Sequence, residues 1–589
     1  MVGRVIEPRK RHESEGSIHS PSGGDTGATA DGAAGQDATA DESSEAAASL
    51  PGSESSARHH MSPARKPGDL EGTSPPMVGG RKAREGDEPQ AVEAQASKPK
   101  APEESDALMV PEKSANSRVT PEESMEGRGA AEGNLAQRNA SRAQPRADAL
   151  TRLERVRQRA HERKGEKFTN LMSLITVQLL RQAYSRLHKE AAPGVDGETW
   201  SSYGADLDAR LLDLESRVHR GSYHPLPVRR VHIPKGDGRT RPLGIPALED
   251  KLVQEAVRMV LEPIYEEEFL GFSYGFRPGR SQHGALDALA VALQRKVNWV
   301  LDADIRSFFD TIDHGWLRQF VEHRIGDRRL VRLLMKWLHA GVVEGGAFHE
   351  VRKGTPQGGN ISPLLANIYL HYVLDLWVRQ WRKRQARGQM YVVRYADDFV
   401  MGFQYEQDAR AMREALAARL AGFGLELHPE KTRVFRFGRY AHEHCAQEGR
   451  ARPETFDFLG FTHISARGPG GRLRVVRRTS RKKRQAKLGM LRKEIRRRRH
   501  DPVPEQHRWL VAVLRGHANY YGVPGNSSAM ASFRHQVRSA WHRQLQRRSQ
   551  RASWTTAKRQ RFEGRFPLPS LRICHPQPQD RFYATHRRP

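Results

Sequence analysis

Two adjacent carboxylates, Asp397 and Asp398, lie between two apolar stretches of the sequence, VVR before Tyr395 and FVMGF after Asp398. The β-branched and aromatic residues of these stretches predict paired strands with the acids at the tip of a hairpin. Magnesium prefers carboxylate and phosphate oxygens, so this tip could hold two ions if another strand contributed a third acid. The alternative is a solvated turn, because aspartate is common in turns for ordinary hydrogen-bonding reasons.

The third acid is expected at the end of an upstream strand. The segment NWVLDADI, residues 298–305, alternates so that Val300, Asp302 and Asp304 share one strand face. Asp304 is the last of these residues and would bring its carboxylate to the hairpin tip. Asp302 is a rival on the same face, and a helix N-cap or a solvent-facing acid is the structural alternative for Asp304.

The distribution of charge divides the chain into two parts. The 589 residues have a net charge of +29, but residues 1–150 contain 18 basic and 25 acidic side chains and no Phe, Tyr or Trp. Such a segment cannot bury enough apolar surface to offset its ordering entropy, so we expect a disordered N-terminal extension. The other 439 residues have a net charge of +36, which favours RNA or DNA as a partner over a merely soluble basic surface.

Cysteine usage and hydropathy indicate the compartment. The two cysteines, Cys445 and Cys574, can support neither a disulfide framework nor a zinc ribbon. No apolar run reaches membrane-spanning length, and the first residues lack a signal-peptide core. We therefore expect a cytoplasmic protein with no membrane partner.

Hydrophobic periodicity and turn residues predict an α+β fold around the acids. A charged hairpin is expected over residues 228–246, with its turn at Gly236-Asp237-Gly238, and a Gly-broken loop over residues 272–286. Asp313 is the expected N-cap of a helix, and a Gly-rich loop should lead into a long apolar helix within residues 353–378. The other predicted elements are helices at 150–167, 177–188, 252–265, 284–295, 327–340 and 405–423, a strand pair at 425–437, an aromatic strand at 456–463, and basic helical segments at 477–499, 505–521 and 528–548.

Nine short motifs in a fixed order carry a family resemblance over roughly residues 150–589. They are APGVDG, IPKGDGRTRPLGIP, FSYGFRPGRSQHGAL, DADIRSFFDTIDH, KGTPQGGNISPLLANIYL, RYADDF, LELHPEKTR, FDFLGF and LRGHANYYGVPGN. The chain resembles a group II intron-encoded reverse transcriptase and maturase. The resemblance implies a right-hand polymerase fold, with fingers and palm over residues 151–466 and a thumb and helical maturase domain over residues 467–589.

The resemblance implies that Asp304, Asp397 and Asp398 are the catalytic acids of the palm. Two Mg²⁺ ions are expected at Asp304, Ile305, Asp397 and Asp398. These ions would activate a 3′ hydroxyl and neutralise the leaving pyrophosphate, so the protein needs no nucleophile of its own.

The same resemblance assigns a pocket for dNTP substrates. Lys235 and Arg241 match residues that grip the triphosphate, although as isolated residues both could be ordinary surface cations. Phe309 resembles the bulky side chain that would clash with a ribonucleotide 2′ hydroxyl, and its alternative is a core position like that of Phe308. Gln357 and Tyr395 are expected to line the same pocket.

Contacts to nucleic acid are expected from the palm and from the basic tail. Gly358, Lys431 and Gly460 are expected to contact the primer or template. Basic helices with Trp509 and Trp541 nearby suit phosphate contact and stacking on unpaired bases, whereas a basic run without context is usually a solvated face. The expected RNA contacts are Arg481, Lys482, Lys483, Arg484, Arg492, Arg496, Tyr520 and Tyr521.

The leading hypothesis is a polymerase that copies intron RNA into DNA and assists splicing by binding the intron. Its expected partners are the intron RNA and a DNA target with a primer, and a homodimer stays open. A polymerase-inactive RNA-binding splicing factor is the second hypothesis, and a reverse transcriptase recruited to a host role such as phage defence is the third. Because no cysteine pairs follow the helical domain, second-strand cleavage by the protein itself is not expected.

Overall fold

The computed structural model describes residues 151–234, 240–549 and 554–585. The predicted disordered extension over residues 1–150 lies outside the described residues, and so do Lys235 and the turn Gly236-Asp237-Gly238. None of the helices in the described ranges combines the length and the apolar composition needed to cross a membrane.

A four-stranded antiparallel sheet in the order β6-β7-β3-β8 carries the acids. Its strands are β6 (Met390–Tyr395), β7 (Asp398–Phe403), β3 (Trp299–Asp304) and β8 (Arg433–Arg436). One face buries Leu301 and Phe399 in the main core, whereas Val300 and Val400 of the other face pack into a second core. The predicted hairpin and the alternation of β3 are therefore confirmed, because successive side chains of a strand point to opposite faces.

Several helices begin where the sequence predicts. Asp313 caps α8 (His314–Arg324) by accepting a hydrogen bond from the Trp316 amide, and Asp327 caps α9 (Arg328–Leu338) in the same way. The long apolar helix is divided into α10 (Ser362–Leu370), a π-helical turn (His371–Asp375) and α11 (Leu376–Arg384). The other helices of this region are α5 (Leu248–Glu266), α6 (Gln282–Leu293), α7 (Phe308–Thr311), α12 (Glu406–Ala421) and α13 (Ala441–Gln447).

A second sheet, in the order β2-β1-β4-β5, contains the predicted charged hairpin. β1 (Val228–Pro234) pairs with β2 (Thr240–Ile245), and β4 (Val342–Glu344) joins β1 in parallel before turning into β5 (Ala347–His349). The helix at residues 151–162 is shorter than predicted, because Gly165 adopts a φ of 90° in the turn that follows. The next helices are α2 (Val177–Arg186), α3 (Trp200–Tyr203) and α4 (Leu207–Arg220).

A third sheet, in the order β11-β10-β9, corrects two predicted boundaries, and β8 of the acid-bearing sheet corrects another. The single aromatic strand at 456–463 is a hairpin of β9 (Thr455–Phe458) and β10 (Phe461–Arg467), which turns at Leu459 and Gly460 with φ values of 48° and 78°. The basic segment from Arg477 begins as a strand, β11 (Leu473–Thr479), because its alternating residues pair with β10. Residues 425–437 contain one strand, β8, and not the predicted pair.

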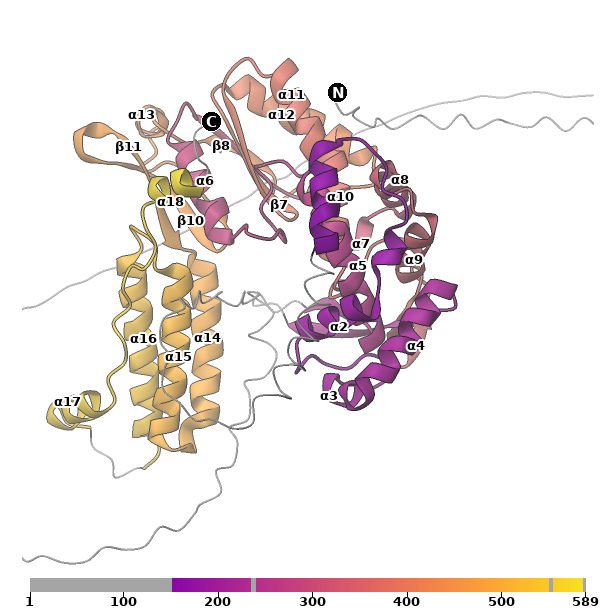
Figure 1. Ribbon diagram of the computed structural model, residues 1–589. Coiled ribbons are helices and arrows are strands. Elements are labelled where there is room, and N and C mark those ends of the chain that lie inside the picture. The colour runs from indigo at the N-terminus through magenta and orange to yellow at the C-terminus, as the bar shows by residue number, and fades with distance from the viewer. Residues whose placement is uncertain (1–150, 235–239, 550–553, 586–589) are drawn as a thin grey trace, which may run out of the picture. The chain divides into compact units, whose positions relative to one another are not determined.

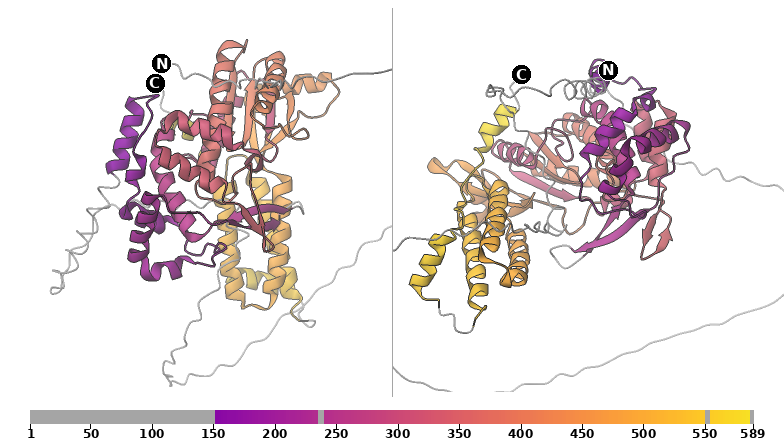
Figure 2. Two further views of the ribbon diagram at one scale, coloured as in Figure 1. Left: turned by 90° about the vertical axis from the view of Figure 1, so that its right-hand side faces the viewer. Right: turned by 60° about the horizontal axis from the view of Figure 1, so that its bottom comes forward.

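Three long helices lie side by side after this sheet, as Figures 1 and 2 show: α14 (Arg481–Arg497), α15 (Val503–Tyr521) and α16 (Ser527–Gln546). The apolar residues Leu488, Leu491 and Ile495 of α14 are buried between these helices. Trp541, expected to stack on RNA, is 1% exposed, and its indole nitrogen donates to Gln506 at 2.8 Å. That expectation was wrong, because this ring fills the core of the bundle. The chain continues through α17 (Thr556–Arg565) and α18 (Pro578–Thr585).

Candidate active site

Strand register brings the predicted acids together. Asp304 at the end of β3 lies opposite Asp398 at the start of β7, and Asp302 lies opposite Val400. Cross-strand partners point to the same face of a sheet, so Asp302, Asp304 and Asp398 share one face. Asp397 precedes β7 in a turn that starts at Ala396, a non-glycine residue with a φ of 57°.

The pKa shifts show that these carboxylates interact. Burial raises the pKa of Asp398 well above its ordinary value, and repulsion from Asp302, Asp397 and Asp304 adds to the shift. Burial also raises the pKa of Asp397, with repulsion from Asp304 contributing. For Asp302, burial raises the pKa to about 6 against the opposing effect of Arg433. A cation placed among these groups would relieve both the repulsion and the cost of desolvation.

Lys431 supplies positive charge to this cluster. Its ammonium group donates to the carboxylate of Asp304, and the amide of His428 in the same loop donates to the Asp304 carbonyl at 2.8 Å. Within the described parts of the chain, no three Asp, Glu, His or Cys side chains are arranged so that they could hold one metal ion. The donor set is nevertheless all carboxylate, which is the chemistry that Mg²⁺ selects.

A buried ion pair supports the turn from below, and no pattern in the sequence predicted it. Arg394, the residue before Tyr395, donates to both carboxylate oxygens of Asp375 at 2.7 and 2.5 Å, and neither side chain is exposed. Its remaining terminal nitrogen donates to the carbonyl of Ala396 at 2.9 Å and to Asn367 at 3.1 Å. Asp375 belongs to the π-helical turn, so this irregular part of the helix positions the acid that pairs with Arg394 next to the hairpin tip.

A second support comes from the Gly-broken loop at residues 272–286. The Tyr274 amide donates to the Arg394 carbonyl at 2.8 Å, and the Arg394 amide donates to the Phe272 carbonyl at 2.9 Å. A Cβ on Gly275 would lie 2.2 Å from the amide nitrogen of Ala396. Only glycine therefore allows this loop to lie against the backbone of the hairpin tip.

The described residues assigned to the nucleotide pocket are Phe309 on α7, Tyr395 on β6, Arg241 on β2 and Gln357 in the loop of the TPQGG motif. Phe308 is 2% exposed in the main core, whereas Phe309 is half-buried and meets the Phe308 ring edge-on at a centroid distance of 5.5 Å. Ile305 is buried at the end of β3. Phe309 is therefore not a second core residue like Phe308. Tyr395, at the end of β6, is half-buried as well.

The TPQGG loop is attached to the charged hairpin. The Gly244 amide of β2 donates to the Gln357 carbonyl at 2.6 Å, and Gly358 has a φ of 123°. A Cβ on Gly358 would lie 2.3 Å from the Gly244 carbonyl oxygen. This contact connects Gln357 with the strand that carries half-buried Arg241, three residues before Gly244.

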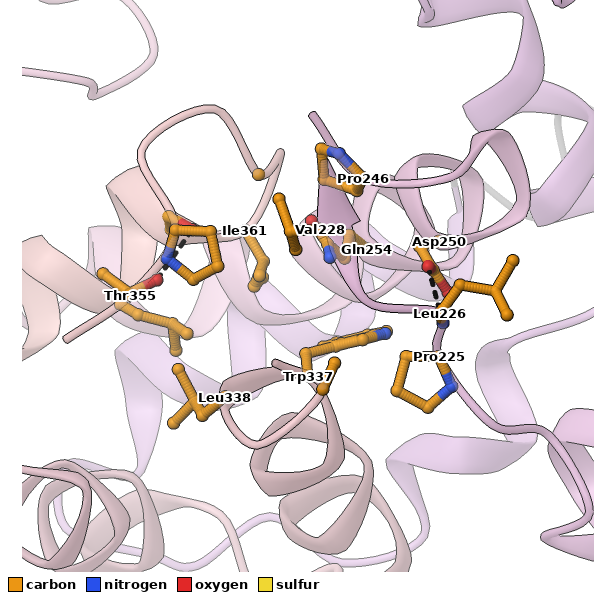
Figure 3. A pocket seen from close by; sticks show the side chains of 15 residues that line it. Pro225, Leu226, Val228, Pro246, Asp250, Gln254, Trp337, Leu338, Thr355 and Ile361 are labelled. Carbon is orange, nitrogen blue, oxygen red and sulfur yellow. Dashed lines mark hydrogen bonds between the residues drawn. The ribbon is translucent and has the colours of Figure 1, made fainter. Parts of the chain in front are cut away.

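A mostly apolar pocket adjoins the same loop, and the acids do not line it (Figure 3). Thr355 and Pro356 come from the loop, and Trp337 and Leu338 come from α9. Asp250 accepts a hydrogen bond from the Leu226 amide at 3.1 Å, and burial raises its pKa to about 7. The pocket thus belongs to the packing of the loop and the charged hairpin.

Comparisons with known proteins agree with this arrangement. A family model described as "Reverse transcriptase (RNA-dependent DNA polymerase)" matches residues 233–463. Protein YkfC of Escherichia coli (strain K12) is 38% identical over 317 residues, which are 48% of this chain and 79% of YkfC. The group II intron-encoded protein LtrA of Lactococcus lactis subsp. cremoris is 38% identical over 234 residues, which are 39% of each chain. The chain belongs to the group II intron-encoded reverse transcriptase and maturase family.

Part of the chain is also similar to a plant maturase. Nuclear intron maturase 3, mitochondrial, of Arabidopsis thaliana is 33% identical over 129 residues, which are 22% of this chain and 18% of that protein. The chain thus spans most of YkfC but less than half of LtrA and of the plant maturase.

Most of the basic residues expected to contact RNA are exposed on α14. They are Arg481, Lys482, Lys483, Arg492 and Arg496, while Arg484 is half-buried. Arg477, from the same basic segment, is 2% exposed and forms an ion pair with Asp287 at 2.6 Å. Arg477 therefore fastens β11 to α6 and is inaccessible to RNA.

The two tyrosines at the end of α15 are engaged by the protein. The Tyr520 hydroxyl donates to the Leu459 carbonyl at 2.8 Å, and the Tyr520 ring stacks on Phe461 at 5.7 Å. Tyr521 lies near the hairpin of β9 and β10, because a Cβ on Gly460 would meet its hydroxyl at 3.0 Å. Both side chains are half-buried, so an RNA contact would use the remaining exposed part of each ring.

Proposed function

We propose that this chain is an RNA-directed DNA polymerase that also binds its group II intron RNA, assisting splicing and copying the intron into DNA. The observation that carries the proposal is the register of β3 and β7, which pairs Asp304 with Asp398 beside Asp397. Acids from two distant segments converge on one sheet face, as two-metal phosphoryl transfer requires. Family membership supports the same activity.

In this proposal Asp304, Ile305, Asp397 and Asp398 would hold two Mg²⁺ ions. When bound, such ions lower the barrier to attack by a 3′ hydroxyl and stabilise the charge of the leaving pyrophosphate. Lys431 forms an ion pair with Asp304, and in this proposal it exchanges that carboxylate for a primer or template phosphate. The buried pair of Arg394 and Asp375 keeps the turn in position throughout.

We assign the dNTP pocket to the surroundings of these acids. Arg241 would grip the triphosphate together with Lys235, which lies outside the described residues. Phe309 would exclude a ribonucleotide 2′ hydroxyl, because its ring is half-buried next to the rigid, fully packed Phe308. Gln357 and Tyr395 would line the base and sugar side, with Gly358 allowing the loop backbone to approach closely.

The proposed layout has fingers and palm over residues 151–466 and a thumb and maturase domain over residues 467–589. The three-helix bundle supports a separate C-terminal domain, since its core, from Leu488 to Leu568, is distinct from the two cores that flank the acid-bearing sheet. β11 pairs with β10, and Val475 packs in the second core, so this strand joins the two proposed domains. Exposed cations along α14 would contact intron phosphates. Gly460 and the hairpin of β9 and β10 would support the primer end next to them.

One observation favours a second candidate, a polymerase-inactive RNA-binding splicing factor. The carboxylate of Asp304 is paired with Lys431, and the acids of the described chain do not stand in a ready-made metal-holding arrangement. For this candidate the half-buried acids would have lost their catalytic role, and Lys431 would compensate the charge of Asp304. Both candidates bind intron RNA, so only an assay of polymerisation separates them.

The decisive experiment is primer extension on an RNA template with dNTPs and Mg²⁺. We expect product from the wild type and at least a 10³-fold loss from Asp397→Asn, on the order expected when a main electrostatic contribution to phosphoryl transfer is removed. Asp213→Asn is a matched control, because Asp213 is an exposed carboxylate of α4. Intron RNA binding by both variants should stay within a few-fold of wild type.

Two results would count against the proposal. If purified wild-type protein yields no extension product under these conditions but binds intron RNA, the splicing-factor candidate replaces the polymerase. If Asp397→Asn extends primers as well as Asp213→Asn does, the acid cluster is not the catalytic site.

A further inference from the structure

Phe276 combines two unusual properties next to the acid cluster. Its side chain is 44% exposed, and its backbone has a φ of 58°, a conformation that costs energy for any residue with a Cβ. Among the residues that the structure describes, no other large hydrophobic side chain is both exposed and in this conformation. Glycine at this position would make the fold more stable, because glycine adopts this conformation without strain.

The position of Phe276 is fixed from both sides. Gly275 lies against the Ala396 backbone, and the Gly275 carbonyl accepts a hydrogen bond from Asn367 at 2.7 Å. On the other side Arg277 is 4% exposed, pairs with Glu266 at 2.9 Å and donates to the Ser273 carbonyl at 2.8 Å. Buried contacts on both sides therefore hold the backbone of Phe276 in its left-handed conformation.

The ring of Phe276 extends the surface of the catalytic turn. Its centroid lies 6.5 Å from that of Tyr395, at an angle of 46° between the ring planes. Tyr395 is the residue immediately before Ala396 and Asp397. The two rings together form an aromatic surface beside the place where the proposed function puts the primer end.

We propose that Phe276 is a binding residue for the terminal base pair of the primer–template duplex, with its ring contacting a nucleobase at the growing end. The proposal rests on the proposed polymerase function. Strain retained at an exposed residue is expected where the side chain has a binding role. Aromatic rings stack on bases regardless of sequence, which suits an enzyme that copies any template. A protein partner is disfavoured, because the ring is immediately beside the acid cluster.

The test measures duplex binding without dNTPs, using the full chain. A DNA primer is annealed to an RNA template that carries 2-aminopurine opposite the primer terminus, and both affinity and fluorescence are recorded. We expect wild-type protein to quench the fluorophore by stacking. Phe276→Ala and Phe276→Gly should bind about 5- to 100-fold more weakly and lose the quenching. Phe276→Tyr should restore both signals.

Two controls separate binding from folding. Phe348→Ala removes another exposed ring, 60% exposed on β5, and should change neither signal. Phe276→Gly relieves the backbone strain, so its unfolding midpoint should equal or exceed that of wild type while its affinity falls. A structural role would instead lower the midpoint of both Phe276→Ala and Phe276→Gly.

The proposal is overturned if Phe276→Ala binds and quenches as wild type does, or if its loss of affinity matches a loss of folded protein. A wild type that binds and quenches the duplex but extends no primer would refute the polymerase function alone. A wild type that extends primers while Phe276→Ala retains full quenching would refute the role of Phe276 alone.

Discussion

Breaking the buried ion pair under the catalytic turn should destabilise the protein and misplace the turn. Arg394 and Asp375 are both fully buried and joined by two hydrogen bonds of 2.7 and 2.5 Å. In Arg394→Met the Asp375 carboxylate keeps its charge without its partner, which costs about 3–5 kcal/mol. The Ala396 carbonyl also loses its 2.9 Å donor, which adds about 1–3 kcal/mol. Since domains are stable by about 5–15 kcal/mol, the variant should be marginal at 25 °C.

A double variant separates the two effects. Arg394→Met with Asp375→Leu removes both charges, so most of the ion-pair penalty should disappear. The Ala396 carbonyl still has no donor, and Ala396 is in a left-handed conformation that needs such support. We therefore expect urea unfolding to return to within about 2 kcal/mol of wild type. Primer extension per folded molecule should remain at least tenfold low, because a small misplacement of catalytic groups costs rate steeply.

The control is a second buried arginine whose ion pair does not involve the catalytic turn. Arg324 is 1% exposed and pairs with Glu268 at 3.0 Å, so Arg324→Met should also destabilise the fold. Its extension activity per folded molecule should equal that of wild type. Full activity of the double variant would show that the pair serves folding alone. Unfolding of Arg394→Met at the wild-type urea concentration would show that the pair does not stabilise the fold.

Three further predictions concern the sugar of the substrate, the RNA surface and acid stability. Phe309→Ala should raise incorporation of ribonucleotides relative to deoxyribonucleotides about 10- to 100-fold in primer extension, whereas Phe308→Leu should reduce stability without changing this ratio. Intron RNA binding should weaken when Gln replaces the exposed α14 cations Arg481, Lys482, Lys483, Arg492 and Arg496. The slope of log affinity against log salt concentration should flatten by about 0.7 for each phosphate that is no longer neutralised. Gln at the exposed residues Arg410 and Arg413 of α12 should change neither quantity, and equal salt slopes for the two variants would exclude α14 from the RNA-binding surface. Burial lowers the pKa values of His283, His371 and His463 to about 3. Below about pH 6.5 the unfolded state therefore binds more protons than the folded state. For each of these histidines the free energy of unfolding should fall by about 1.4 kcal/mol for every pH unit below that point. His371→Gln should remove one such contribution when urea unfolding is compared at pH 7.5 and pH 5, and an unchanged slope would contradict the burial of that ring.

Local patterns in the sequence were sufficient for much of the fold. Alternation over residues 298–305 placed Asp302 and Asp304 on one strand face, and Asp313 was predicted correctly as the N-cap of a helix. These features follow from interactions within a few residues, which the sequence states directly. The predicted element boundaries were wrong where pairing with a distant segment decides them. The basic residues of β11 have the same composition as the helix that follows, and only their pairing with β10 makes them a strand.

The sequence by itself determined which residues could do chemistry, through the acids, the order of the motifs and the difference in charge between residues 1–150 and the rest of the chain. The tertiary structure alone decided how those residues are held. The pairing of Arg394 with Asp375, the close approach of Gly275 to Ala396, the burial of Trp541 and Arg477, and the exposure of Phe276 all depend on segments far apart in the chain. The physical reason is that burial and ion pairing depend on which residues surround a side chain in three dimensions. The residue types and their spacing along one strand or helix do not specify those neighbours.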